Sequence, residues 1–294
     1  MPPVLARHES RGLSYLRGGE GTPLVLLHGV PGSARSWAPV GRHLAAHYDV
    51  IIPDLSGFGH SDEQGQHLHL DHEFYMEAHA ETIQGLLDDL HVDSFLLGAH
   101  DFGGPVALTL IRLFPEYMPD GLVLSATRLL TQTHEPWPLR IAGMPGLGPL
   151  AVRLVAGTRV GLRLLYRAAV QNKAVFGIDA FEHHLTRSGL KQTRRILQRS
   201  LAHRTDRYAE LEALLPDLEV PTLVLWGDHD PFLPVAGGKQ LVDVLPRATL
   251  AVFKETGHFV PEERPAGVAG HIDDFFRAHS SRSTRPVWER WSPS

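Results

Sequence analysis

Short, continuously apolar runs recur along this chain, separated by turns rich in glycine, proline and polar residues. Runs of about five apolar residues suit β-strands that are buried on both faces, as strands are in a parallel sheet. Six of them lie at residues 23–27, 50–53, 95–98, 122–124, 222–226 and 249–253. The more polar opening segment leaves room for two short antiparallel strands, at residues 4–8 and 13–17.

Helical patterns fill several of the intervals between these runs. Residues 37–47, 75–90 and 103–114 carry apolar side chains near helical spacing. Strands that alternate with helices build a parallel sheet with helices on both faces. The sequence therefore predicts an α/β protein.

The alternation stops between residues 128 and 216, where no strand-like run appears and the strongest helical patterns are at 152–170 and 189–202. We therefore expect one core domain, built from residues 1–127 and 217–294, that is interrupted by a helical cap of residues 128–216. An insertion after the carboxyl end of a strand covers the edge at which α/β sheets bind ligands.

Composition narrows the functions that are open to the chain. The absence of cysteine excludes disulfides, thiolate metal sites and a cysteine nucleophile. The net charge of −5, from 28 basic and 33 acidic residues, argues against a nucleic-acid partner. No segment has the apolar length of a signal peptide or a membrane span. We therefore expect a cytoplasmic protein with no nucleic-acid and no membrane partner.

The most informative segment joins a predicted strand to a predicted helix: Leu96-Leu97-Gly98-Ala99-His100-Asp101-Phe102-Gly103-Gly104. Strand, sharp turn and helix, with small residues around the turn, form a nucleophile elbow in serine hydrolases. Asp101 stands where those enzymes have serine, and the chain contains no Gly-x-Ser-x-Gly. The alternative interpretation is that Asp101 only caps the following helix.

Two segments near the carboxyl end favour the catalytic interpretation. Gly227-Asp228-His229-Asp230-Pro231 follows one strand, and Gly257-His258-Phe259 follows the last. Nucleophile, acid and histidine then occur in the chain order of α/β-hydrolases. Asp230 is the predicted acid that orients His258, and Asp228 is a rival in the same turn.

A glycine-containing loop, His28-Gly29-Val30-Pro31-Gly32-Ser33, follows the strand at 23–27. Its backbone amides, at Val30 above all, could join the amide of Phe102 in an oxyanion hole. The loop is also explained as a tight turn that needs Gly29 and Gly32, and both interpretations can hold together.

Together these motifs resemble the α/β-hydrolase superfamily, in the branch with an aspartate nucleophile that includes epoxide hydrolases and haloalkane dehalogenases. The motif Asp54-Leu55-Ser56-Gly57-Phe58-Gly59-His60-Ser61 adds to the match, which spans residues 24 to 275. The resemblance implies the α/β-hydrolase fold: a mostly parallel, eight-stranded sheet with helices on both faces and an inserted helical cap.

The leading interpretation is an epoxide hydrolase that adds water through a covalent alkyl-aspartyl ester on Asp101 and yields a vicinal diol. A carboxylate can displace directly at an sp³ carbon, and His258 would then deprotonate the water that hydrolyses the ester. The expected substrates are a small apolar epoxide and water, without a cofactor. The alternatives are a haloalkane or haloacid dehalogenase with the same nucleophile, and a non-hydrolytic or binding-only protein of this fold.

Epoxide and halide chemistry differ in the group that stabilises the leaving atom. Members of the dehalogenase branch hold halide with a tryptophan after the nucleophile and an asparagine or second tryptophan, but Phe102 and Val30 stand there, with Trp37 or Trp137 as other donors. Epoxide hydrolases use tyrosines of the cap as proton donors. The candidates here are Tyr166 and Tyr208. His183, His184 and His203 are alternative donors, and each tyrosine could instead be a buried aromatic with a satisfied hydroxyl.

The expected substrate pocket collects residues of these motifs and two tryptophans: His28, Pro31, Trp37, His100, Trp137 and Phe259. His67, His69 and His72 lie in a polar loop, and we interpret them as solvated residues and predict no metal. The oligomeric state stays open, with a homodimer as one option.

Overall fold

An eight-stranded sheet forms the centre of the computed structural model, which describes residues 4–61, 75–131, 144, 147–155, 158–202 and 206–280. The strands are β1 (Ala6–Ser10), β2 (Leu13–Gly18), β3 (Thr22–Leu27), β4 (Tyr48–Pro53), β5 (Leu96–His100), β6 (Gly121–Ser125), β7 (Thr222–Gly227) and β8 (Ala248–Phe253). Their order is β1-β2-β4-β3-β5-β6-β7-β8. β2 pairs antiparallel with β1 and β4, and all other pairs are parallel. The predicted fold class is confirmed.

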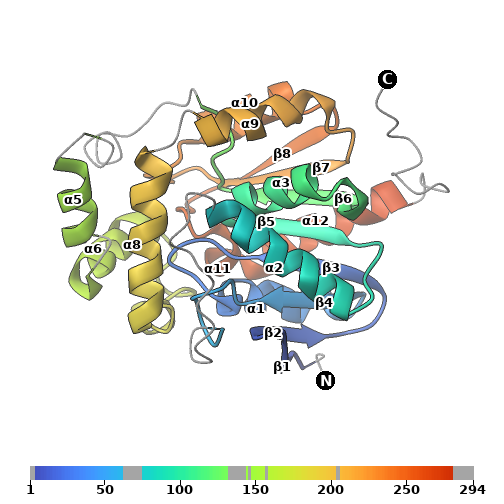
Figure 1. Ribbon diagram of the computed structural model, residues 1–294, viewed down its shortest axis with the longest axis horizontal. Coiled ribbons are helices and arrows are strands. Elements are labelled where there is room, and N and C mark those ends of the chain that lie inside the picture. The colour runs from blue at the N-terminus through green and yellow to red at the C-terminus, as the bar shows by residue number, and fades with distance from the viewer. Residues whose placement is uncertain are drawn as a thin grey trace.

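Helices cover both faces of this sheet (Figure 1). On one side α1 (Ala34–Leu44) contacts α11 (Val260–Glu263) and α12 (Pro265–Ser280). On the other side α3 (Gly103–Leu113) contacts α2 (Tyr75–Asp89) and α9 (Asp206–Leu214), while α10 (Val235–Val244) packs on β7 and β8. The 3₁₀ turns η1 (Pro115–Tyr117) and η2 (Leu215–Asp217) complete the core. The central strands are buried on both faces, which explains why their sequences are apolar throughout.

Further helices between β6 and β7 lie beyond one end of the sheet, where Figure 1 shows α5, α6 and α8. They are α5 (Leu147–Val155), α6 (Arg159–Ala169), α7 (Ile178–Glu182) and α8 (Arg187–Ala202). The single helix predicted at 152–170 is wrong, because Thr158 is extended and its hydroxyl accepts a hydrogen bond from Gly161 N at 3.0 Å, so that a new helix begins there.

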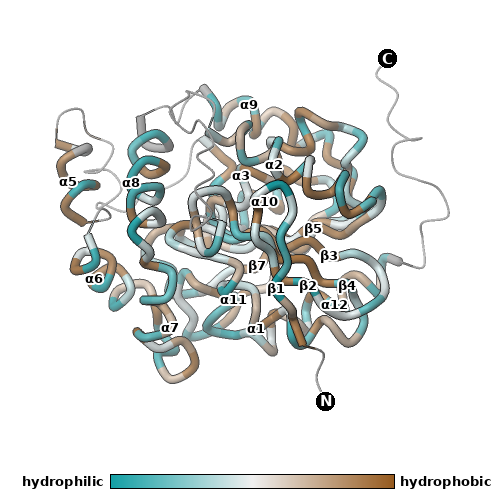
Figure 2. The backbone as a smooth tube through the Cα atoms, turned by 60° about the horizontal axis from the view of Figure 1, so that its bottom comes forward, coloured by the Kyte–Doolittle hydropathy of each residue, from teal (hydrophilic) through white to brown (hydrophobic). Residues whose placement is uncertain are grey.

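These helices have an apolar cluster of their own. Val152, Leu162, Tyr166, Phe176 and Phe181 are buried members of it, and Phe259 of the core joins them. In contrast, α9 falls within the predicted cap range but packs on α3, and its buried side chains belong to the main core. Figure 2 also shows α5 and α6 at one side of the molecule, apart from the strands of the sheet.

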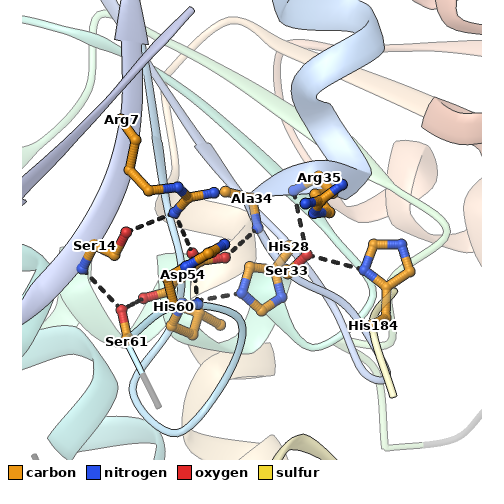
Figure 3. Close-up of polar contacts among 11 residues, drawn as sticks. Arg7, Ser14, His28, Ser33, Ala34, Arg35, Asp54, His60, Ser61 and His184 are labelled. Atoms are coloured by element: carbon orange, nitrogen blue, oxygen red, sulfur yellow. Dashed lines mark hydrogen bonds and ion pairs between the residues drawn. The ribbon is translucent and has the colours of Figure 1, made fainter. Parts of the chain in front are cut away.

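A buried carboxylate anchors the loops at the carboxyl edge of the sheet (Figure 3). Asp54, just past β4, accepts hydrogen bonds from Ala34 N at 2.6 Å and His60 N at 3.0 Å, and pairs with Arg7 at 2.9 Å. Ser61 adds a bond to the backbone oxygen of Asp54. The loop that precedes α1 is thereby tied to β4 and to the first strand.

His28 contributes a second anchor to the same loop. Its Nε2 accepts a hydrogen bond from Leu55 N at 2.9 Å, so its Nδ1 carries the proton and donates to Gly29 O at 2.8 Å. Burial lowers the pKa of His28, which fits a neutral ring. Ser33 then links the loop to the inserted helices, because its hydroxyl lies 2.9 Å from Nδ1 of His184 (Figure 3).

We predict that Asp54→Ala destabilises the fold by about 2–4 kcal/mol, because it leaves the N–H groups of Ala34 and His60 and the guanidinium of Arg7 without their shared acceptor. Urea denaturation followed by circular dichroism measures the change. Asp243→Ala, an exposed carboxylate on α10, is the control and should change stability by less than about 0.5 kcal/mol. Equal stabilities of the two variants would contradict this role for Asp54.

Candidate active site

Asp101 occupies a strained turn between β5 and α3. Its φ of +48° lies in the left-handed region, which costs free energy for a residue with a Cβ. Three hydrogen bonds hold the turn: Asp101 N donates to Ser125 O at 3.1 Å, and Asp101 O accepts from Gly104 N at 3.0 Å and from the hydroxyl of Thr127 at 2.6 Å. A Cβ on Gly104 would lie 2.0 Å from that hydroxyl, so glycine is required there. This is the geometry of a nucleophile elbow.

The carboxylate of Asp101 faces the loop that follows β3. Oδ2 accepts a hydrogen bond from Val30 N at 2.8 Å. A Cβ on Gly29 would lie 2.4 Å from Cβ of Asp101, so the loop can approach only because this residue is glycine. The side chain of Asp101 keeps 22% of its surface exposed and can therefore meet a ligand. The amide of Phe102, the other predicted oxyanion donor, stays a prediction.

His258 lies between two carboxylates. Its Nδ1 is 2.8 Å from Oδ2 of Asp230, and its Nε2 is 3.7 Å from Oδ1 of Asp101. Asp230 is itself fixed, because Oδ1 accepts hydrogen bonds from Phe232 N at 2.9 Å and Leu233 N at 3.0 Å. The structure thus brings together the three residues of the predicted triad.

The rival acid Asp228 lies elsewhere in the same turn. It pairs with Nδ1 of His229 at 2.6 Å and accepts a hydrogen bond from Thr256 N at 3.2 Å. The carboxylate of Asp228 therefore stabilises the loop that precedes His258, and its described partners do not include the imidazole of His258. The geometry therefore favours Asp230 as the orienting acid.

The charged groups of the triad shift one another's pKa values in favour of the charged forms. Burial by itself lowers the pKa of His258, but the charges of Asp230 and Asp101 and the hydrogen bonds to both raise the pKa well above its ordinary value. Burial likewise raises the pKa of Asp101, and the hydrogen bond and charge of His258 outweigh it, so that the pKa ends below its ordinary value. The resting site therefore favours an imidazolium between two carboxylates.

A cavity of about 230 Å³ opens above Asp101. Seven of the predicted site residues line it: Val30, Pro31, Asp101, Phe102, Tyr208, His258 and Phe259. The rest of the described lining is almost entirely apolar, from the core and from α5, α6, α7 and α8: Pro105, Ala151, Val152, Val155, Leu162, Leu165, Phe181, Ile196, Leu197, Phe232 and Leu233. Such a lining suits an apolar ligand that is oriented by a few polar groups.

Three predicted pocket residues, His28, Trp37 and His100, are not among the described residues that line the cavity. Each is fully buried and uses its polar atoms elsewhere. Trp37 donates to Leu27 O at 2.9 Å, Nε2 of His100 lies 3.0 Å from His258 O, and His28 braces the loop as described above. Trp137 lies outside the described residues.

The two candidate tyrosines occupy different places. Tyr208 lines the cavity together with Asp101. Tyr166 is absent from the described lining, and its hydroxyl donates to Phe176 O at 2.6 Å, so the geometry favours Tyr208 over Tyr166 as proton donor. It is a buried aromatic residue with a satisfied hydroxyl.

The alternative histidine donors do not reach the described part of the cavity either. His183 is exposed and its Nδ1 lies 2.6 Å from Asp179 O, while His184 is bonded to Ser33. His203, His67, His69 and His72 lie outside the described residues. No cluster of three or more histidine, aspartate or glutamate side chains that could hold a metal occurs among the described residues. No described helix is long and apolar enough to cross a bilayer.

The cavity also holds Arg128, which the sequence did not single out. Its guanidinium carbon lies 5.8 Å from the centre of the Tyr208 ring, within cation–π range. The available signal was its position, three residues past the carboxyl end of β6, at the edge where ligands bind.

We predict that Asp101→Asn lowers the pKa of His258, because the neutral amide removes a negative charge that stabilises the imidazolium. A pH titration of the histidine ring signals by NMR measures the shift. Asp230→Asn should lower the pKa as well, whereas Asp228→Asn should leave it unchanged. An unaltered His258 titration in Asp101→Asn would disprove the coupling.

Comparison with known proteins places the chain in a family. Residues 22–265 match the family model described as alpha/beta hydrolase fold. The chain is 29% identical to the uncharacterized hydrolase YugF of Bacillus subtilis, over 86% of this chain and 89% of that protein. It is 26% identical to a 2-hydroxy-6-oxo-6-phenylhexa-2,4-dienoate hydrolase of Burkholderia cepacia, over 91% of each chain.

Among solved structures, the haloalkane dehalogenase DbeA of Bradyrhizobium elkani superposes with a TM-score of 0.77 at 17% identity, covering 96% of this chain and 100% of the other. At this identity the likeness shows the fold alone. The hydrolase names of the sequence relatives support an enzyme of the hydrolase class. On the match over residues 22–265, the chain belongs to the alpha/beta hydrolase fold family.

Proposed function

We propose that this protein is an epoxide hydrolase that opens its substrate with the carboxylate of Asp101 and releases a vicinal diol. One observation carries the proposal: a carboxylate stands at the elbow, held by Val30 N–H, in a cavity that Tyr208 also lines. The first group is a nucleophile for an sp³ carbon, and the second is an O–H donor for the oxygen that leaves it.

In the first half-reaction, one oxygen of Asp101 attacks an epoxide carbon and the C–O bond of the ring breaks. Tyr208 donates its proton to the released oxygen, which becomes a hydroxyl group. Arg128 lies beside Tyr208 and adds positive charge where negative charge develops. The product is an ester between Asp101 and the substrate.

In the second half-reaction, His258 acts as the base. Formation of the ester removes the charge of Asp101, which is one of the causes that raise the pKa of His258. The imidazolium then loses its proton to solvent and can take one from a water molecule, which attacks the ester carbonyl.

The oxyanion that forms on Asp101 lies against Val30 N–H and the predicted donor Phe102 N–H. His258 passes the proton to the departing alcohol oxygen, and the carboxylic acid left on Asp101 ionises and restores the proton of Tyr208. His258 then regains from solvent the proton that it lost before hydrolysis. The sum is epoxide plus water to diol.

An epoxide fits this site better than a halide. Phe102 follows the nucleophile and has no side-chain N–H, and Trp37 donates its N–H to Leu27 O. Among the described lining residues, the side-chain N–H groups belong to Arg128 and His258. In this proposal residues 128–216 form a cap whose helices α5 to α8 supply most of the apolar wall, Tyr208 comes from α9 beside the core, and the substrate is a small apolar epoxide.

We predict that His258→Gln traps the ester after exposure to styrene oxide, because the first step survives and the base of the second is lost. Mass spectrometry of the Asp101 peptide should show the added mass of the substrate. The wild-type enzyme in ¹⁸O-water should place label in the Asp101 carboxylate after a single turnover. Asp101→Asn is the negative control and should show neither.

The same experiment with a bromoalkane separates the two branches. Trapping and diol formation with the epoxide, without halide release from the bromoalkane, supports the proposal. Halide release without epoxide turnover would assign the dehalogenase alternative, and the absence of any adduct or label with both compounds would refute the covalent mechanism.

We predict that Tyr208→Phe slows ester formation by about 10²-fold or more, the usual contribution of a general acid, while hydrolysis of a preformed ester is less affected. Rapid-quench kinetics separate the two steps. Tyr166→Phe is the matched control, because its hydroxyl points to Phe176 O; it should keep the rate of ester formation and lose about 1 kcal/mol of stability. Equal rates in both variants would exclude Tyr208 as the donor.

A further inference from the structure

Strongly exposed apolar side chains gather on two neighbouring helices, α5 and α6. Their members are 53% to 67% exposed: Leu147, Leu150, Leu154, Val160 and Leu164. The spacing of three and four residues on α5, and of four on α6, places them on one face of each helix. The two helices contact each other, and Gly161 permits a close approach, since a Cβ there would lie 1.9 Å from Val155 O. Large exposed apolar side chains that gather on neighbouring helices in this way point to an interaction site.

The same helices are strongly basic. Arg153, Arg159, Arg163 and Arg167 are exposed, and neither helix contains a carboxylate. Arg163 pairs with Glu182 at 2.5 Å, whereas the other three form no ion pair with any residue that the structure describes.

This positive charge is local. Residues 144–202 contain ten arginine and lysine residues and two acidic residues, while the whole chain has 28 basic and 33 acidic residues. The rest of the molecule is therefore strongly acidic. We name the five apolar and four arginine side chains of α5 and α6 the outer face.

We propose that the outer face docks on an anionic lipid bilayer. Amphipathic helices with leucine and valine on one side and arginine beside them bind in the plane of such a surface. The apolar stems of the arginines can follow the leucines while their guanidinium groups meet lipid phosphates. This proposal departs from the expectation of no membrane partner, which rested on the absence of a signal peptide and of a spanning segment; docking on a surface requires neither.

A second copy of the chain fits the outer face less well than an anionic lipid surface. A two-fold symmetric dimer through this face would bring the arginines of one protomer against those of the other. Like charges repel, whereas anionic phosphates complement Arg153, Arg159 and Arg167, which lack a described ion-pair partner. The positive charge of the outer face therefore favours an anionic lipid surface over a second copy of the chain.

The outer face is continuous with the catalytic cavity. Val155 is 41% exposed and also lines that cavity, as do Ala151 and Val152 of α5 and Leu162 of α6. An apolar molecule dissolved in the bilayer would find apolar surface from the outer face to Asp101. This route for the substrate rests on the proposed function, but docking itself does not.

Co-sedimentation of the full-length protein with lipid vesicles tests the proposal. We expect binding to vesicles of equal parts phosphatidylcholine and phosphatidylglycerol at low salt, weaker binding to phosphatidylcholine alone, and loss of binding as salt rises. The double variant Arg153→Gln/Arg159→Gln should bind the mixed vesicles about 25-fold more weakly, at roughly fivefold per arginine. The double variant Leu150→Ser/Leu154→Ser should also bind more weakly.

Matched controls lie outside the outer face. Arg42→Gln and Val252→Ser replace exposed residues of α1 and β8 and should bind like the wild type. Asp101→Asn should also bind like the wild type, which separates docking from the proposed catalysis. Circular dichroism verifies that each variant is folded.

Three results would overturn the proposal. The first is no sedimentation with either kind of vesicle at low salt. The second is binding by both double variants that equals that of Arg42→Gln and Val252→Ser. The third is self-association in solution that Leu150→Ser/Leu154→Ser abolishes, without vesicle binding, which would assign the outer face to a second copy of the chain.

Discussion

The strained backbone of Asp101 is the constraint on which the rest of the site depends. A residue with a Cβ stays at a φ of +48° only if its surroundings fix it. Here the hydroxyl of Thr127 and the amide of Gly104 hold the carbonyl of Asp101 from two directions. The strained turn places the carboxylate of Asp101 beyond the end of β5, where it accepts a hydrogen bond from Val30 N. This geometry also requires glycine at positions 29 and 104, because a Cβ at Gly29 would collide with Asp101 and a Cβ at Gly104 would collide with Thr127.

Sequence patterns predicted the strands well and the pocket less well, for physical reasons. A strand that is buried on both faces needs a run of consecutive apolar residues, and such runs predicted β3, β5 and β7 from the sequence. The sequence contains no comparable signal for the direction in which a single side chain, such as that of Trp37 or His100, points. Neither side chain lines the described cavity, because Trp37 donates its N–H to Leu27 O and Nε2 of His100 lies 3.0 Å from His258 O.

The inserted helices show the same limit. Tyr166 and Tyr208 are equivalent in the sequence as aromatic residues of one helical region, and only packing separates them. Tyr166 lies in the aromatic cluster with Phe176 and Phe181, while Tyr208 belongs to α9, which rests on α3. Arg128 was missed because no motif contains it; the turn after β6 brings it to the cavity.

Hydrogen bonds join the loop that carries His258 to the end of α6. His258 N donates to Ala169 O, the last residue of α6, at 2.9 Å, and a Cβ on Gly257 would lie 1.7 Å from that oxygen. Glu263, which is almost fully buried, accepts hydrogen bonds from Gly257 N at 3.1 Å and from Gln171 N at 2.8 Å. The end of α6 therefore helps to fix the imidazole. Since α6 also carries part of the outer face, a force that displaces this helix acts on the acceptor of the His258 amide, so the proposed base and the proposed docking surface share one helix.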